Sequence, residues 1–85
     1  MIPTIGRTVI YKTTEEERAK LEELGKKTAC NVQDELPATI VAVWGEHEEA
    51  AINLKVHIDG DIGDWWITSR TVGENEGEWH WPTKL

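Results

Sequence analysis

The sequence predicts one small domain, residues 1–85, that is mainly β and has one helix inserted after the first strand. Residues 52–58 alternate apolar and polar side chains without exception, which is typical of a strand buried on one face. Segments rich in β-branched residues precede and follow it, and turn signals at Gly45 and at Asp59-Gly60 separate the segments. Together they predict a three-stranded antiparallel meander between Pro37 and Arg70.

The chain before the meander is expected to hold the first strand and the helix. Thr4–Tyr11 predicts a strand in which Gly6 allows a bend or bulge. Thr13 and Thr14 each precede a glutamate by three residues, so either can form a capping box, and the helix is expected at about residues 14–25. We expect this helix to rest on the β structure with a narrow buried stripe, because the apolar residues of its middle are Ala19, Leu21 and Leu24.

The remaining segments complete the predicted fold. Residues 28–36 are expected to be a connector, and Pro37 is expected to open the next strand at its edge. After the meander, an acidic turn at 73–77 leads to a short final strand that Pro82 ends. Five short strands with one inserted helix predict a small, strongly bent barrel of the SH3-like kind, with an OB-like barrel as the alternative.

Length and charge restrict the classes of partner. A chain of 85 residues buries only about 60–65% of its unfolded surface, and association of copies is a common remedy for so thin a core. We therefore expect a homo-oligomer.

Nine Lys and Arg against sixteen Asp and Glu give a formal net charge of −7, which argues against binding to a DNA or RNA polymer. A small anionic ligand needs only a local cluster of positive charge, so it stays compatible with the sequence.

Cysteine and histidine usage gives no sign of a metal, a cofactor or a catalytic motif. The one cysteine, Cys30, cannot form an intramolecular disulfide and is expected to be a small buried apolar residue. Met1 is not followed by the apolar segment of a signal peptide, and the sequence has no apolar segment long enough to span a membrane. We therefore expect cytoplasmic residence without membrane contact. The three histidines, His47, His57 and His80, have no metal-ligand spacing, and we expect no enzyme activity.

A resemblance covers nearly the whole chain. Residues 6–11, 31–32, 37–45, 52–56, 59–60, 66–69 and 78–82, in this order, resemble a family of small bacteriophage and prophage proteins that end in a Trp-His-Trp-Pro motif, here Trp79-His80-Trp81-Pro82. The segment from Thr13 to Cys30 departs from that pattern. The resemblance implies a phage accessory protein that acts in the cytoplasm of a host bacterium.

The five tryptophans and the absence of phenylalanine suggest ligand stacking. Trp79 and Trp81 are two residues apart and share one face of the final strand, while His80 lies on the other. One interpretation is that the tryptophans fill the barrel, each with an indole N–H that needs a partner. The other is that they stack on a flat ligand, and nucleobases are the obvious flat ligands because each stacked base contributes about 1–3 kcal/mol.

The predicted ligand-binding residues combine stacking rings, cations for a phosphate and polar groups for base edges. Arg70 is the preferred phosphate ligand, and Lys26 and Lys27 are either further cations or a solvated helix end. The full predicted set is Arg7, Tyr11, Asn31, Trp66, Thr68, Ser69, Arg70, Trp79, His80 and Trp81.

Three functions are compatible with these observations. We predict a non-enzymatic phage protein that binds and sequesters a small nucleotide immune signal, of the cyclic oligonucleotide or cyclic ADP-ribose type, and so counters antiphage defence. Burial of the ligand between protomers would suit a domain with a thin core. The alternative is a protein-interaction or virion-associated module that uses the tryptophans and a free strand edge. The third is a small hydrolase that uses His80.

Overall fold

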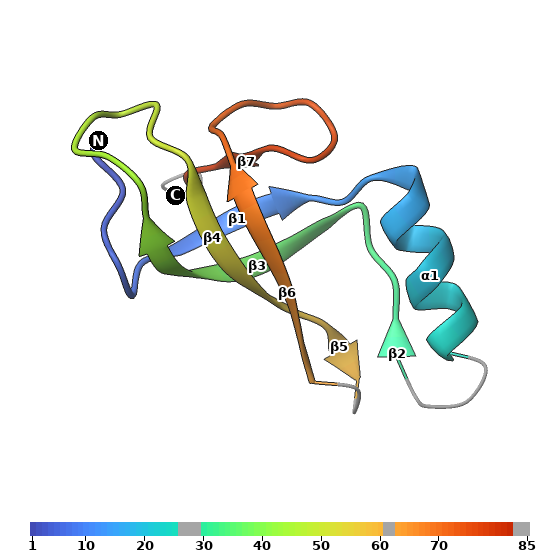
Figure 1. The fold of residues 1–85 in the computed structure, drawn as a ribbon. Helices are drawn as coiled ribbons and strands as arrows, with labels where there is room; N and C mark the ends of the chain where they lie inside the picture. The colour runs from blue at the N-terminus through green and yellow to red at the C-terminus, as the bar shows by residue number, and fades with distance from the viewer. Residues whose placement is uncertain (26–29, 61–62, 83–85) are drawn as a thin grey trace.

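The expected strands and helix are present in the computed structural model, which describes residues 1–25, 30–60 and 63–82. Figure 1 shows these elements along the chain. Their bounds are β1 (Thr8–Lys12), α1 (Glu15–Gly25), β2 (Cys30–Asn31), β3 (Glu35–Val43), β4 (Ile52–His57), β5 (Asp59–Gly60), β6 (Asp64–Arg70) and β7 (Trp79–His80).

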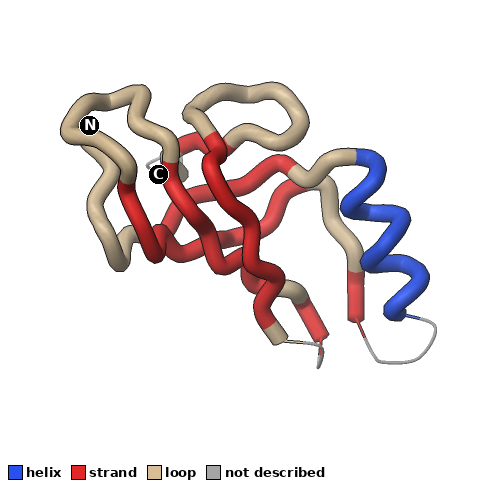
Figure 2. The backbone as a smooth tube through the Cα atoms, viewed as in Figure 1, coloured by secondary structure: helices blue, strands red, loops and turns tan. Residues whose placement is uncertain are grey.

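Five of these strands form one antiparallel sheet in the order β6-β4-β3-β1-β7, and β2 pairs separately with β5. Beyond β6 the chain turns back, and Val72 makes a parallel bridge to Trp79 of β7. Because β6 and β7 are the two outer strands, this bridge brings the ends of the sheet together and curls it (Figure 2). The predicted mainly β fold with one helix is confirmed, whereas the choice between SH3-like and OB-like stays a prediction.

The alternating segment behaves as predicted. In β4 the apolar residues Ile52, Leu54 and Val56 are buried, while the polar residues between them lie on the outer face of the sheet. Register irregularities occur between Ile40 and Ala42 in β3 and between Ile52 and Leu54 in β4. Such bulges bend a sheet and increase its twist, which is how five short strands enclose a core.

Aromatic residues occupy the centre of that core. Trp79 has no exposed surface and Tyr11 is almost fully buried. The Trp79 ring packs against the half-buried Trp81 ring in a T-shaped arrangement, with a centroid distance of 5.2 Å and an interplanar angle of 87°. The Trp79 indole N–H donates to the Arg70 carbonyl at 3.3 Å. The barrel-filling interpretation therefore holds for Trp79.

The start of α1 shows which threonine forms the capping box. The Thr14 amide donates to Glu17 Oε1 at 2.8 Å, and the Glu17 amide donates to Thr14 Oγ1 at 3.1 Å. Along the helix, Leu21 is buried and joins the core, whereas Leu24 and Ala19 are exposed. Leu21 is the buried residue of α1, so the narrow buried stripe is confirmed. Figure 1 shows α1 beside β2 at one end of the sheet.

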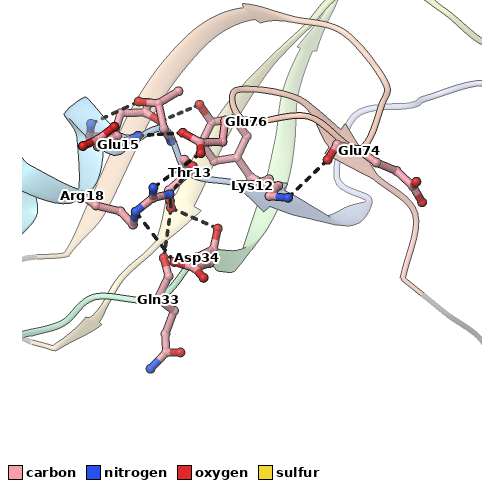
Figure 3. A network of polar contacts seen from close by, with 11 residues as sticks. Lys12, Thr13, Glu15, Arg18, Gln33, Asp34, Glu74 and Glu76 are labelled. Atoms are coloured by element: carbon pink, nitrogen blue, oxygen red, sulfur yellow. Dashed lines mark hydrogen bonds and ion pairs between the residues drawn. The ribbon is translucent and has the colours of Figure 1, made fainter.

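Thr13 connects three parts of the chain instead of capping the helix. Its buried hydroxyl lies 3.0 Å from the carbonyl oxygens of both Gln33 and Asp34. The Arg18 guanidinium donates to the Thr13 carbonyl at 2.6 Å and also lies near carboxylates of Asp34 and Glu76, at 3.7 and 3.6 Å. Figure 3 shows how this network joins the helix start, the segment before β3 and the loop before β7.

Replacing Thr13 with valine is expected to lower the free energy of unfolding by about 0.5–1.5 kcal/mol, because the buried hydroxyl no longer donates to the Gln33 and Asp34 carbonyls while the side-chain volume is kept. Urea denaturation of the wild type and of Thr13→Val measures the difference. The matched control is Thr4→Val, since Thr4 is exposed. Equal midpoints for Thr13→Val and wild type would show that the Thr13 hydroxyl contributes nothing.

Two predicted strand boundaries were wrong. The first strand begins at Thr8 and not at Thr4, because Gly6 has a φ of 93° and forms a turn whose amide donates to the Ile40 carbonyl at 2.8 Å. β3 begins at Glu35, so Pro37 lies within it. The register of β3 with β4 starts at Ala38, and before that residue β1 is the one strand that pairs with β3 in the described part of the chain. Pro37 is therefore at a local sheet edge, where a missing N–H is tolerated.

The expected connector at 28–36 also contains regular structure. Cys30 and Asn31 pair with Gly60 and Asp59, so the predicted turn at Asp59-Gly60 is part of a short ladder. The expectations for Lys26 and Lys27 lie outside the described residues, and the expected burial of Cys30 concerns a side chain that the structure does not describe.

Candidate functional site

A cleft of about 490 Å³ lies between the start of α1 and the outer strand β6. Sites for small ligands typically measure about 300–1,000 Å³, so the cleft is large enough for a nucleotide. The cleft lining comprises Thr14, Glu16, Glu17 and Lys20 from the helix segment and Trp65, Trp66, Ile67, Thr68 and Arg70 from β6.

Trp66 supplies the exposed ring of the cleft. Along β6, Ile67 points into the core and Trp65 packs partly against it, so the alternation turns Trp66 outward. Trp66 is 59% exposed although it is a large apolar residue. An exposed indole face is a surface on which a planar ligand can stack.

Arg70 is held at the end of the cleft by three contacts. Its guanidinium carbon lies 5.9 Å from the Tyr11 ring centroid, and Nη2 lies 3.9 Å from Glu17 Oε2. A Cβ added at Gly77 would approach Nη1 to 3.1 Å, so the loop before β7 also packs closely on the guanidinium. The buried Nε has no hydrogen-bond partner among the described residues. These contacts restrict the guanidinium orientation and leave donor capacity for a ligand.

Glu17 links the cleft to the core. Besides capping α1, its Oε1 accepts a hydrogen bond of 2.7 Å from the Tyr11 hydroxyl. Burial raises the pKa of Tyr11 strongly, and the neighbouring carboxylate of Glu17 raises it further, because a phenolate there would be desolvated and repelled.

The pKa of Tyr11 predicts how stability changes at alkaline pH. The folded pKa lies above the usual 10.0, so the folded state holds the phenol proton more tightly than the unfolded chain does. This stabilisation is complete below pH 10 and is lost as the pH rises beyond it. Urea denaturation at a series of pH values should show a decline above about pH 10 that is shallower in Tyr11→Phe. Identical declines in the two proteins would contradict this origin.

Only part of the predicted site is assembled in the cleft. Trp66, Thr68 and Arg70 line it, and Tyr11 lies beneath Arg70. Ser69 follows on β6, with a φ of 53° and an amide that donates to the Asn53 side chain at 3.0 Å. Tyr11 and Trp79 were predicted to bind the ligand directly, but this is wrong because both are core residues with almost no exposed surface.

The other predicted residues lie elsewhere. Arg7 stacks on Trp81 at 5.4 Å from the ring centroid. This pair is separate from the cleft lining. The Asn31 amide donates to Asp59 at 2.9 Å within the β2–β5 pair. His80 Nε2 lies 3.5 Å from Glu35 Oε1, and its buried Nδ1 has no hydrogen-bond partner among the described residues.

Sequence reasoning missed the helix side of the cleft. Glu16 and Lys20 lie four residues apart, and their charged groups form an ion pair at 3.6 Å. Their spacing places them on one helix face, but which strand this face meets depends on the packing of α1 and cannot be seen in the spacing.

A second polar cluster was also missed, on the outer face of the sheet. His57 Nε2 lies 2.8 Å from Thr39 Oγ1, and His57 Nδ1 lies 2.9 Å from Asp64 Oδ1. The alternation of β4 indicated that His57 is on the polar face. The partners follow only from the register of three strands.

Among residues 1–25, 30–60 and 63–82, no group of three or more His, Cys, Asp and Glu side chains is placed to hold a metal ion. No helix within these ranges has the length and apolar character needed to cross a membrane. Compared with protein-family models, with curated proteins and with solved structures, the chain matches none of them.

Proposed function

We propose that the cleft between α1 and β6 binds a small nucleotide without changing it chemically. The observation that carries the proposal is the pairing of the exposed Trp66 ring with the Arg70 guanidinium in one cleft of about 490 Å³. Stacking of a base on Trp66 supplies about 1–3 kcal/mol. The guanidinium offers paired donors to phosphate oxygens.

The charges of the cleft limit how anionic the ligand is. Lys20 and Arg70 are balanced by Glu16 and Glu17, and each cation lies near one of these carboxylates. Glu17 is already occupied by the helix cap and by Tyr11, so it stays in place when a ligand enters. We therefore propose that Arg70 meets one phosphate group, and that the base and sugar occupy the remaining space.

The biological role that we propose rests on the phage resemblance. A phage protein that binds a cyclic oligonucleotide or a cyclic ADP-ribose isomer in the cytoplasm of its host would lower the free concentration of an immune signal. The cleft lies at the outer strand of the sheet. A second protomer that covers this edge would bury more of the ligand, which supports the expected homo-oligomer.

The test is a thermal-shift panel of cyclic di-AMP, cyclic GMP–AMP, cyclic tri-AMP and cyclic ADP-ribose isomers. A compound present at one hundred times its Kd stabilises the fold by about 2.7 kcal/mol, which raises Tm by roughly 10–20 °C in a domain of this size. Denaturing the complex should release the compound intact, as judged by mass spectrometry. Recovery of a cleaved product, or no stabilisation across the panel, would overturn the proposal.

A second candidate function is docking of a protein partner. Trp44, the residue after β3, is 64% exposed, and Val41 within β3 is also exposed. The edge strand β6 has β4 as its one strand neighbour in the sheet of the described residues. These features favour the addition of a partner strand. If the protein docks a partner, Trp44→Ala should lose that partner while any nucleotide binding is kept. If the protein sequesters a nucleotide, Trp44→Ala should change neither nucleotide binding nor binding of a protein partner.

A further inference from the structure

Three strands bring a hydroxyl, an imidazole and a carboxylate into one chain of hydrogen bonds on the outer face of the sheet. Thr39 belongs to β3, His57 to β4 and Asp64 to β6. The distances are 2.8 Å from Thr39 Oγ1 to His57 Nε2 and 2.9 Å from His57 Nδ1 to Asp64 Oδ1. The His57 side chain is 43% exposed and the Asp64 side chain 48%, so a molecule in solution can reach the group.

The order of these contacts determines where the protons lie. A carboxylate only accepts hydrogen bonds, so Asp64 requires that His57 Nδ1 carries the proton. In the neutral imidazole, Nε2 is then an acceptor, and the Thr39 hydroxyl must be its donor. This is the arrangement in which a histidine, oriented by a carboxylate, acts as general base toward a hydroxyl nucleophile.

Lys55 lies next to Thr39 on the same face of the sheet, and Trp66 lies one strand further out. The register places Lys55 directly opposite both Thr39 and Trp66, on neighbouring strands. Lys55 is exposed, and no contact of its ammonium with another described group is seen. Partners in an antiparallel ladder lie about 4.5–5.5 Å apart at Cα, so the ammonium can reach an oxygen bound beside Thr39. The outward ring of Trp66 supplies a surface for a planar substituent.

We propose that Thr39, His57 and Asp64 form an acyl-transfer site for small activated carboxylic esters, an activity beyond nucleotide binding. Thr39 Oγ1 attacks the ester carbonyl carbon while its proton passes to His57 Nε2, and Lys55 stabilises the oxyanion. The carbonyl re-forms as the ester C–O bond breaks, and His57 returns the proton to the leaving alkoxide. A water molecule, deprotonated by His57, then cleaves the acyl-Thr39 ester and releases the acid. Asp64 is a positioning residue. This site acts on carboxylic esters, so a nucleotide bound in the cleft keeps its phosphodiester bonds.

The first test maps the nucleophile. The folded protein is treated with an alkyl fluorophosphonate, whose phosphorus is attacked by activated hydroxyls with loss of fluoride, and the labelled peptide is identified by mass spectrometry. Labelling of Thr39 is expected, and it should be absent from His57→Gln. Label confined to other residues, or no label on the folded wild type, would overturn the proposal. Because the labelled residue is identified in the wild type, this result tests the proposal even if the His57→Gln variant fails to fold.

The second test measures hydrolysis of p-nitrophenyl acetate. Thr39→Val and His57→Gln should each reduce the rate on the order of a hundredfold. The control is His47→Gln, because His47 is an exposed imidazole in the loop between β3 and β4, away from this site, and its replacement should leave the rate unchanged. If His47→Gln lowers the rate as much as His57→Gln does, the hydrolysis comes from surface imidazoles and the proposal fails.

The third test separates the positioning role of Asp64 from a structural one. Asp64→Asn can donate to His57 Nδ1, which would move the imidazole proton to Nε2 and prevent the Thr39 hydroxyl from donating. The ¹⁵N chemical shifts of the His57 ring should report this change of tautomer, together with loss of hydrolysis, and Asp64→Glu should restore both. An unchanged tautomer, or full activity in Asp64→Asn, would contradict the role.

Discussion

Replacing Trp79 with alanine is expected to lower the free energy of unfolding by about 3–5 kcal/mol. The side chain is completely buried, it packs on Trp81, and its indole donates to the Arg70 carbonyl. Its strand also joins β1 and the segment after β6, so a cavity there weakens closure of the sheet. Small domains have a total stability of about 5–15 kcal/mol, so the variant should be close to unfolding.

Urea denaturation followed by circular dichroism measures this loss. The matched control is Trp44→Ala, which removes the same side chain from a site that is 64% exposed. The control should change the free energy of unfolding by about 0.5 kcal/mol or less. If the two variants had equal stability, Trp79 would not be the centre of the core.

Replacing Trp66 with alanine is expected to raise the Kd of the nucleotide that stabilises the wild type by about 5- to 150-fold, which corresponds to the 1–3 kcal/mol of one stacked base. The fold should survive, because Trp66 is 59% exposed. Isothermal titration calorimetry measures both constants. Trp44→Ala is again the control, since Trp44 is exposed to a similar degree and lies outside the cleft lining.

Arg70→Gln tests the second half of the same site. It removes the charge that we assign to the phosphate, so the affinity for the nucleotide that stabilises the wild type should fall and depend less on salt concentration. Wild-type affinity in both Trp66→Ala and Arg70→Gln would mean that the nucleotide binds elsewhere.

Local signals in the sequence were sufficient for most of the fold. The alternation in β4 and the capping box at Thr14 and Glu17 depend on residues close together in the chain, and both are present in the structure. The pairing of Cys30-Asn31 with Asp59-Gly60 was missed, because a two-residue ladder joins segments far apart in sequence and has no periodicity. The strand that contains Pro37 was misplaced because the edge that tolerates proline is created by the register of β3 with its neighbours.

The candidate site was less predictable than the fold. The residue types alone did not distinguish Trp79, which fills the core, from Trp66, which faces solvent, because the exposure of each ring depends on how its strand packs in the folded sheet. A shift of one residue in register turns every side chain of a strand to the other face. The contact of Thr39 with His57 and Asp64 depends on two such registers, so the sequence indicated only the face on which His57 lies.

The most direct test of nucleotide binding in the cleft uses the indole N–H signals of the five tryptophans. Two-dimensional ¹H–¹⁵N NMR of the protein, titrated with each cyclic nucleotide of the panel, follows every tryptophan separately. Binding in the cleft predicts large shifts for Trp66 and Trp65, which line it, and little change for Trp44. Shifts confined to Trp44 or Trp81, or no shifts with any compound, would contradict the proposed site.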